Sequence, residues 1–270
     1  MKKLFVLFLF TLVFVSCEKE KLVTVENTDL PLLSSVLVAG VSSGEYTYNK
    51  ANLINEEKSK YFYTKHNYND RNLLISTEYY MDPGMFSSLG TAAEASMNRK
   101  EWVNAHNTEK SLTVTCEYNS NGQLSRSIYT RPSSSNSEYC EFSYENERIS
   151  RQKMYWNSAL STYIDFLYDD NGNLIKQSKY HVPESGVAEL WTTTEYEYDN
   201  MNNPFLAFKR LMLPCRFTNP NNIKKETYTL YFDVDPSLTE RVSTIINTYE
   251  YNSSGYPVKV NGETEYVYKY

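Results

Sequence analysis

The stretch with the plainest chemical meaning is Gly-Val-Ser-Ser-Gly at residues 40–44, which fits the G-x-S-x-G spacing of a hydrolase nucleophile. That spacing works where a strand turns sharply into a helix, because the turn exposes the serine hydroxyl. Here Gly44 leads into Glu-Tyr-Thr-Tyr-Asn, which alternates as a strand does. We therefore expect Ser42 to be an ordinary strand residue, and the stretch predicts no catalytic residue.

Residue types that bind metals are present, but their spacing is not that of a metal site. The histidines, His66, His106 and His181, lie far apart, and none has the H-E-x-x-H spacing. Residues 169–171, Asp-Asp-Asn, lack the distal glutamate of a calcium loop, and turn formation explains them. No phosphate-cradling glycine loop or nucleotide fingerprint occurs. We expect no metal site and no cofactor.

The first sixteen residues have the parts of an export signal: Lys2 and Lys3, an apolar run over residues 4–15, and the small Ser16. The run is shorter than the roughly 20 apolar residues of a membrane span. Cys17 follows, and Phe-Val-Ser-Cys resembles the lipobox of bacterial lipoproteins, where this cysteine is the lipid attachment site. The resemblance implies cleavage before Cys17 and, with Glu18 next, anchoring to the outer membrane, on either its periplasmic or its surface side. The alternative is an ordinary secretory signal with an incidental cysteine.

The net charge of the mature chain limits the classes of partner that it can bind. The whole chain has 27 Lys and Arg against 33 Asp and Glu. Removing residues 1–16 removes two lysines and no acid, which leaves 25 against 33 and a formal charge of minus 8. A nucleic-acid partner requires a basic surface, so we exclude one. The expected partner is the membrane, through the N-terminal lipid, with a glycan or protein partner left open.

Cysteines 116, 140 and 215 remain after processing, an odd number for an oxidising compartment. We expect small core residues, and a disulfide among them stays an open alternative.

An imperfect repeat of about 25 residues organises the rest of the chain. Each copy has a tyrosine, a polar turn, and then a leucine or a similar residue. The copies begin at Tyr48, Tyr68, Tyr118, Tyr144, Tyr168, Tyr198 and Tyr251.

Strand alternation precedes each of these tyrosines. In Thr-Glu-Tyr-Glu-Tyr-Asp, Tyr196 and Tyr198 share one face and the glutamates the other. Asn-Gly at 121–122 and 171–172 predicts two-residue hairpin turns with positive φ. The tyrosine therefore ends one strand and the leucine begins the next. Cross-strand packing explains the 25 tyrosines better than a sugar- or peptide-stacking face, which remains the alternative.

Strict alternation also predicts which face meets water. It places Arg126 and Lys176 on the same side as Leu124 and Leu174, and such charges would be costly against lipid. We expect tyrosines to point inward, glutamates to face water, and the sheet not to span the bilayer.

Two stretches interrupt the repeat. Thr91 and Glu94 form a capping box that predicts a helix near residues 92–105, within a helical insertion of about 86–107. Residues 203–222 form an apolar loop closed by prolines, expected to act as a buried plug or lid with one helical turn.

The repeat resembles the tyrosine-aspartate (YD) repeat of secreted shell-forming and toxin-delivery proteins. With the lipoprotein signal, Tyr-Asp-Asn-Met-Asn-Asn-Pro-Phe and Asn-Asn-Ile-Lys-Lys-Glu-Thr-Tyr, it is similar to a domain-of-unknown-function family of Gram-negative gut lipoproteins with a porin-like fold. The resemblance implies an all-β antiparallel meander of about 12–14 strands, forming a curved or closed barrel-like wall with one inserted helix. We expect a signal peptide (1–16), a lipidated tether (17–33) and one β-repeat domain (34–270).

The resemblance implies no activity, so the sequence favours a non-enzymatic, outer-membrane-anchored binding or envelope-scaffold protein. One alternative is a carbohydrate- or peptide-processing enzyme with carboxylates from separate strands. Another is a carrier that holds an apolar ligand inside the barrel.

Overall fold

The computed structural model describes residues 31–81, 102–211, 218–231 and 241–269. These residues form seventeen β-strands in one sheet and one 3-10 helix, η2 (Leu206–Leu211). The strands are β1 (Leu32–Val38), β2 (Val41–Tyr48), β3 (Ile54–Lys58), β4 (Phe62–Tyr68), β5 (Leu74–Met81), β6 (Lys110–Tyr118), β7 (Leu124–Thr130), β8 (Glu138–Glu145), β9 (Arg148–Trp156), β10 (Ala159–Tyr168), β11 (Leu174–His181), β12 (Glu189–Tyr198), β13 (Ile223–Leu230), β14 (Val242–Ile246), β15 (Tyr249–Tyr251), β16 (Pro257–Val260) and β17 (Thr264–Lys269).

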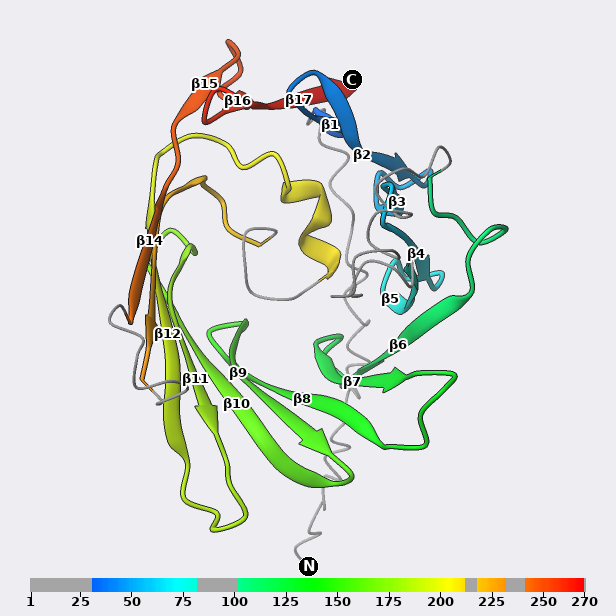
Figure 1. The fold of residues 1–270 in the computed structure, drawn as a ribbon, viewed down its shortest axis with the longest axis vertical. Helices are drawn as coiled ribbons and strands as arrows, with labels where there is room; N and C mark the ends of the chain where they lie inside the picture. Colours follow the sequence, from blue (N-terminus) through cyan, green and yellow to red (C-terminus); the bar gives the residue numbers. More distant parts are fainter. Residues whose placement is uncertain (1–30, 82–101, 212–217, 232–240, 270) are drawn as a thin grey trace, which may run out of the picture.

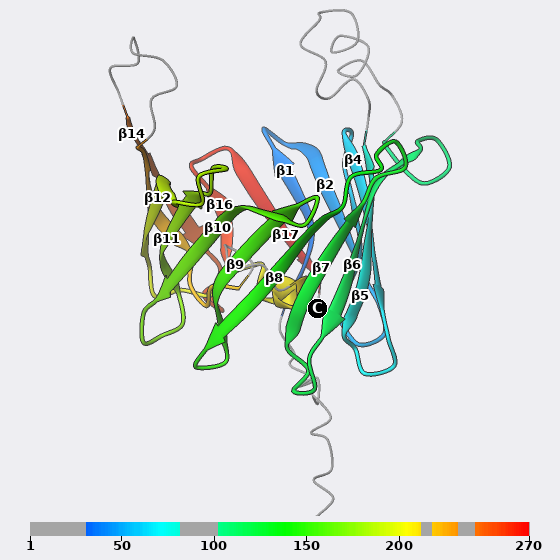
Figure 2. The same cartoon turned by 90° about the horizontal axis from the view of Figure 1, so that it is seen from below.

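The sheet is an antiparallel meander that curls back on itself. Neighbours along the chain pair with one another, and β1 also pairs with β17, so the sheet surrounds an interior (Figures 1 and 2). Among the described residues no ladder joins β14 to β15, which are consecutive pieces of chain. The predicted all-β meander is confirmed, with seventeen strands in place of 12–14, in a sheet that is curled but not closed.

The chain itself joins the two ends of the sheet. Asn247 and Thr248 connect β14 to β15. The Asn247 N–H donates to the carbonyl of Lys224 in β13 at 2.8 Å, and Thr248 O accepts from the N–H of Asn261, the residue after β16, at 2.9 Å. The two-residue link therefore has one neighbour on each side.

The repeat turn has one recurring geometry, seen after Tyr118. The Gly122 N–H donates to Asn119 O at 3.0 Å, and the Asn119 N–H donates to Gln123 O at 2.9 Å. The Asn119 side chain accepts from the N–H groups of Asn121 and Gln123, both at 3.0 Å. The same backbone pair of bonds begins at Asn49, Asn69, Asp169 and Asn252.

The turn corrects the prediction of a two-residue Asn-Gly turn. Only the glycine of each Asn-Gly pair has positive φ, 76° at Gly122 and 95° at Gly172. The turn is longer and ends in a single left-handed residue, a common hairpin form. Asn52 and Asn72 take this position in copies that lack glycine, because asparagine tolerates the left-handed region.

The shorter copy after Tyr144 has the two-residue turn instead. Asn146 and Glu147 there have φ values of 49° and 65°. Both residues are left-handed, as that turn requires.

A β-bulge follows each repeat turn and corrects the predicted faces. Tyr118 pairs with Leu124, whereas Glu117 pairs with Arg126, so Ser125 is the extra residue. A one-residue insertion reverses the facing of everything after it. Arg126 therefore lies on the face opposite Leu124, and the same shift separates Lys176 from Leu174.

The repeat tyrosines point inward, as predicted, and all of them except Tyr251, which bonds to the Asp199 carboxylate, link their hairpin to the one before. Tyr118 Oη donates to Leu74 O at 2.8 Å. The bond gives a partner to the carbonyl of the first residue of β5. With Tyr249 and Tyr268, which lie outside the repeat positions, eight such bonds of 2.5 to 2.9 Å follow the turn end of the sheet within the described residues. They join Tyr48 to Leu33, Tyr68 to Ile54, Tyr118 to Leu74, Tyr144 to Leu124, Tyr168 to Ile149, Tyr198 to Leu174, Tyr249 to Ile223 and Tyr268 to Pro257.

The described part of the expected helix is not helical. Residues 82–101 lie outside the described residues, and residues 102–104 have no regular structure and lead into a turn. Val103 is fully buried, and its N–H donates to Ser59 O at 3.2 Å.

The second interruption folds into the interior. Residues 199–211 and 218–222, hereafter the plug, replace the tight turn between β12 and β13, and η2 lies inside the curled sheet (Figure 1). Phe205 and Phe208 of the plug pack on Leu33 and Ile54 of the sheet. The predicted buried loop with a helical turn is confirmed for these residues, and 212–217 lie outside the described residues.

Candidate binding sites inside the wall

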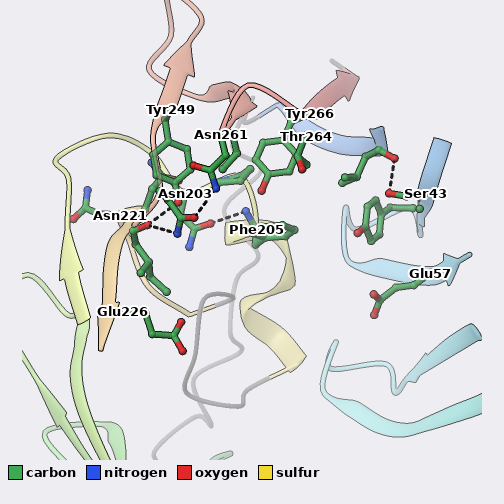
Figure 3. Close-up of a pocket in the computed structure, with 18 of the residues that line it drawn as sticks. Ser43, Glu57, Asn203, Phe205, Asn221, Glu226, Tyr249, Asn261, Thr264 and Tyr266 are labelled. Atoms are coloured by element: carbon green, nitrogen blue, oxygen red, sulfur yellow. Dashed lines mark hydrogen bonds between the residues drawn. The ribbon is translucent and has the colours of Figure 1, made fainter. Parts of the chain in front are cut away.

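The described residues line two cavities on the inner face of the sheet. One, of about 520 Å³, lies between the plug, β2–β3 and β13–β17, and we term it the polar cavity (Figure 3). The other, of about 420 Å³, lies against β3–β8, and we term it the apolar cavity. Both have the size of small-molecule sites in proteins.

The surface of the apolar cavity is mainly carbon. Its apolar lining comes from inward-facing positions of β4–β8: Phe62, Leu74, Met81, Leu112, Val114, Leu124 and Phe142. Tyr79, Tyr129, Cys116, Ser127, Thr64, Thr77, His66 and Glu57 complete it. An apolar body with a few polar points is the usual character of a ligand pocket.

The polar points begin with a hydrogen-bonded row on β3, β4 and β5. The His66 side chain is only 2% exposed, and both of its ring nitrogens are engaged. Nε2 is 3.1 Å from Glu57 Oε1, and Nδ1 is 3.1 Å from Thr77 Oγ1. The row fixes the orientation of the imidazole and of the glutamate, as buried polar groups require.

Glu57 is the polar group of the apolar cavity that can accept a further hydrogen bond. Its side chain is 19% exposed, and no hydrogen bond within the described residues uses its Oε2. Glu57 and Phe62 line both cavities, so the carboxylate lies at their boundary. Burial, helped by the Glu57 charge, raises the pKa of nearby Tyr79 to about 12.

The cavity thiol is poorly suited to covalent chemistry. Burial raises the pKa of Cys116 to about 11, so the thiol stays protonated at neutral pH. Cys140 is fully buried one strand beyond Ser127, and burial also raises its pKa. Both are free thiols and inward-facing residues, and Cys215 lies outside the described residues.

Most amides of the polar cavity already hold the plug in place. Asn203 accepts from the Phe205 N–H at 2.9 Å (Figure 3). It also donates to Asn219 O at 2.8 Å. Asn221 donates to Met201 O at 2.9 Å. Asn247 and Asn261 bond to each other at 3.0 Å. The bonds of Asn203 and Asn221 therefore anchor the plug, whereas the Asn247–Asn261 bond joins the link after β14 to the residue after β16. Few groups are left to bind a ligand.

Two carboxylates from separate strands line the polar cavity, as the hypothesis of a processing enzyme requires. They are Glu57 of β3 and Glu226 of β13, on different sides of the cavity (Figure 3). One oxygen of Glu57 is bonded to His66.

Other residues that the sequence drew attention to lie apart from these cavities. Ser42 is a residue of β2 after a tight turn, not a nucleophile at a strand-to-helix elbow. His106 is exposed in a loop. The His181 ring stacks on the Trp191 ring, with 4.2 Å between the ring centroids. Asp169 caps its own repeat turn. Cys17 lies outside the described residues. Within the described ranges, no three His, Cys, Asp or Glu side chains group as metal ligands do.

Sequence reasoning missed Glu57 and His66 as a pair. The inward position of His66 could have been found by counting in twos from Tyr68, which also places Thr64 and Phe62 inward. The inward position of Glu57 could not, because a register shift between Thr47 and Tyr48 reverses the alternation of β3.

The outer face of the sheet carries cross-strand ion pairs. Lys176 Nζ lies 2.7 Å from Glu195 Oε1, and Lys225 Nζ lies 2.8 Å from Glu197 Oε1. Glu117, Glu141, Glu195 and Glu197 are exposed, as predicted. No helix within the described part of the chain is long and apolar enough to cross a membrane.

Comparison with known proteins gives structural likeness only. No protein-family model matches the chain, and no curated protein matches its sequence. A porin-like protein from Bacteroides vulgatus is 11% identical, with 88% of this chain and 99% of that chain covered and a TM-score of 0.41. One from Bacteroides uniformis is 11% identical, with 88% and 98% covered and a TM-score of 0.38. A DUF3836 family protein from Parabacteroides distasonis is 15% identical, with 41% and 89% covered and a TM-score of 0.29.

Proposed function

We propose that this chain is a non-enzymatic outer-membrane lipoprotein that binds a small apolar molecule inside its curled sheet. The N-terminal sequence supports the proposed location at the outer membrane: an export signal ends at Ser16, and Cys17 follows as the proposed lipid attachment site. Of the functions weighed from the sequence, the carrier of an apolar ligand fits the interior best.

One observation carries the binding function. The plug packs on β1–β3 and β17, with the more polar cavity beside it, whereas the inner face of β4–β8 keeps a mainly apolar cavity of about 420 Å³. Apolar side chains that line an open cavity lose contacts that a ligand can restore. A molecule that transfers its own apolar surface from water into this cavity gains the same hydrophobic free energy that folding does.

The binding function is tested with the mature chain, residues 17–270, and a neutral environment-sensitive dye, N-phenylnaphthylamine. The dye should bind with increased fluorescence. Val114→Phe, which places a ring in the cavity, should weaken binding by tenfold or more. Thr113→Phe, on the outer face of the same strand, is the matched control and should leave binding unchanged. Equal binding by both variants and the parent would refute the function.

Anchoring of the protein to the membrane through Cys17 is tested separately. Cys17→Ala should abolish acyl-chain labelling and move the protein out of the membrane fraction, because the lipid is the proposed anchor. Ser16→Gly keeps a small residue before the cysteine and is the control that should remain labelled. A labelled, membrane-bound Cys17→Ala variant would rule out this anchor.

A further inference from the structure

We propose that the ligand of the apolar cavity carries a hydrogen-bond-donating head group, an amine or a hydroxyl, that binds Glu57. This inference rests on the proposed binding function and specifies the chemical class of the ligand. The ligand is thus an apolar body with a polar end, and the polar end is not an anion.

The charges of the lining support a donor. Among the residues that the structure describes, Glu57 is the only carboxylate that lines the apolar cavity, and neither lysine nor arginine lines it. An anionic head group would therefore lose its hydration without gaining a cationic partner, which is costly in an apolar site. An ammonium group would gain a charge-assisted hydrogen bond, and a hydroxyl a weaker one.

The geometry of Glu57 supplies the acceptor. His66 Nε2 occupies Oε1 at 3.1 Å and so holds the carboxylate in one orientation. Oε2 has no hydrogen bond within the described residues, and the side chain is partly exposed. A donor can therefore bind Oε2 without displacing a partner that the fold requires.

The position of Glu57 explains how one molecule can satisfy both parts of the site. The carboxylate lies where the apolar and the polar cavity meet. A tail against Val114 and Leu112 would leave the head group at this boundary, next to the more polar space. The head group keeps some hydration there, which lowers the cost of its burial.

The test compares three probes with the same ten-carbon chain: decylamine, decanol and decanoate. Each displaces N-phenylnaphthylamine from the mature chain, at near-physiological ionic strength so that distant surface charges are screened. Decylamine should bind about tenfold or more tightly than decanoate, with decanol between them, since a hydrogen bond to a charged group has this effect. Glu57→Gln should remove the preference for the amine and leave decanol binding within about threefold.

Glu226→Gln is the control, because Glu226 lines only the polar cavity. It should keep the preference of the parent protein. The proposal is overturned if decanoate binds as tightly as decylamine, if no probe displaces bound dye, or if both variants lose the preference equally. In these cases the dye still binds and the binding function survives. Absence of dye binding would instead refute the binding function, and the head-group proposal with it.

Discussion

The hydroxyl of Tyr118 donates a 2.8 Å hydrogen bond to the carbonyl oxygen of Leu74, across 44 residues of sequence. Leu74 is the first residue of its strand and is buried, so its carbonyl lies where the ladder begins. The tyrosine at the end of β6 therefore donates a hydrogen bond to the preceding hairpin, β4–β5. Each repeat copy from Tyr48 to Tyr168 supplies a tyrosine as donor and, at the start of its second strand, the carbonyl that accepts from the next copy. This explains why the spacing between the tyrosine and the aliphatic residue recurs along the chain.

Tyr118→Phe removes that donor and keeps the ring. The buried carbonyl then lacks its partner, so the free energy of unfolding should fall by about 1–3 kcal/mol in urea titrations. Tyr163→Phe is the control, because the Tyr163 ring stacks on Tyr180 of the outer face. The control should change stability by less than about 0.5 kcal/mol. Equal effects of the two variants would mean that the tyrosine–carbonyl bonds do not stabilise the sheet.

Gly122 tests the turn geometry without a steric complication. A Cβ built there has only the Arg71 guanidinium nearby, at 3.9 Å, whereas at Gly172 it would meet Arg148 at 2.8 Å. Gly122→Val should cost about 1–3 kcal/mol, because a branched side chain resists positive φ. Gly122→Asn should cost much less, since Asn52 and Asn72 take the same position. Similar costs for valine and asparagine would contradict a left-handed residue in this turn.

Alkaline pH should destabilise the fold. Burial raises the pKa of Tyr79 and of Tyr144 from 10.0 to about 12, and that of Cys116 from 9.0 to about 11. The unfolded chain therefore loses these protons first, which favours unfolding. The stabilising contribution is complete below about pH 9 and declines as pH rises through about 12. Urea midpoints should fall over this range, whereas a constant midpoint would show that these groups titrate normally.

The chain made without residues 1–17, and so without the proposed lipid, should stay folded and dissolved without detergent. The bulges turn Lys176 and Lys225 to the outer face, where each pairs with a glutamate. Charges on a lipid-facing surface cost about 2–4 kcal/mol each at mid-membrane, so this face suits water. Circular dichroism in buffer checks the β structure. Dependence of that structure on detergent would reverse the assignment of the outer face to water.

The repeat made the meander predictable, because alternation before each tyrosine and turn residues after it are local signals. The turn at Asn146 and Glu147 and the bulge at Ser125 were not predictable, because one residue more or less changes the register without changing the residue types. The pairing of His66 with Glu57 depends on strands brought together by the whole sheet. Their contact carries no local signature, so the candidate site could be found only in the structure.

The tyrosine–carbonyl bonds also bear on how such a protein can change in size. Each bond joins one hairpin only to the hairpin before it, as in repeat proteins whose units contact their nearest neighbours. Duplication of one unit in the gene would supply both a new donor and a new acceptor. The circumference could then grow by a hairpin at a time, and the interior volume with it, while every existing contact kept its partner.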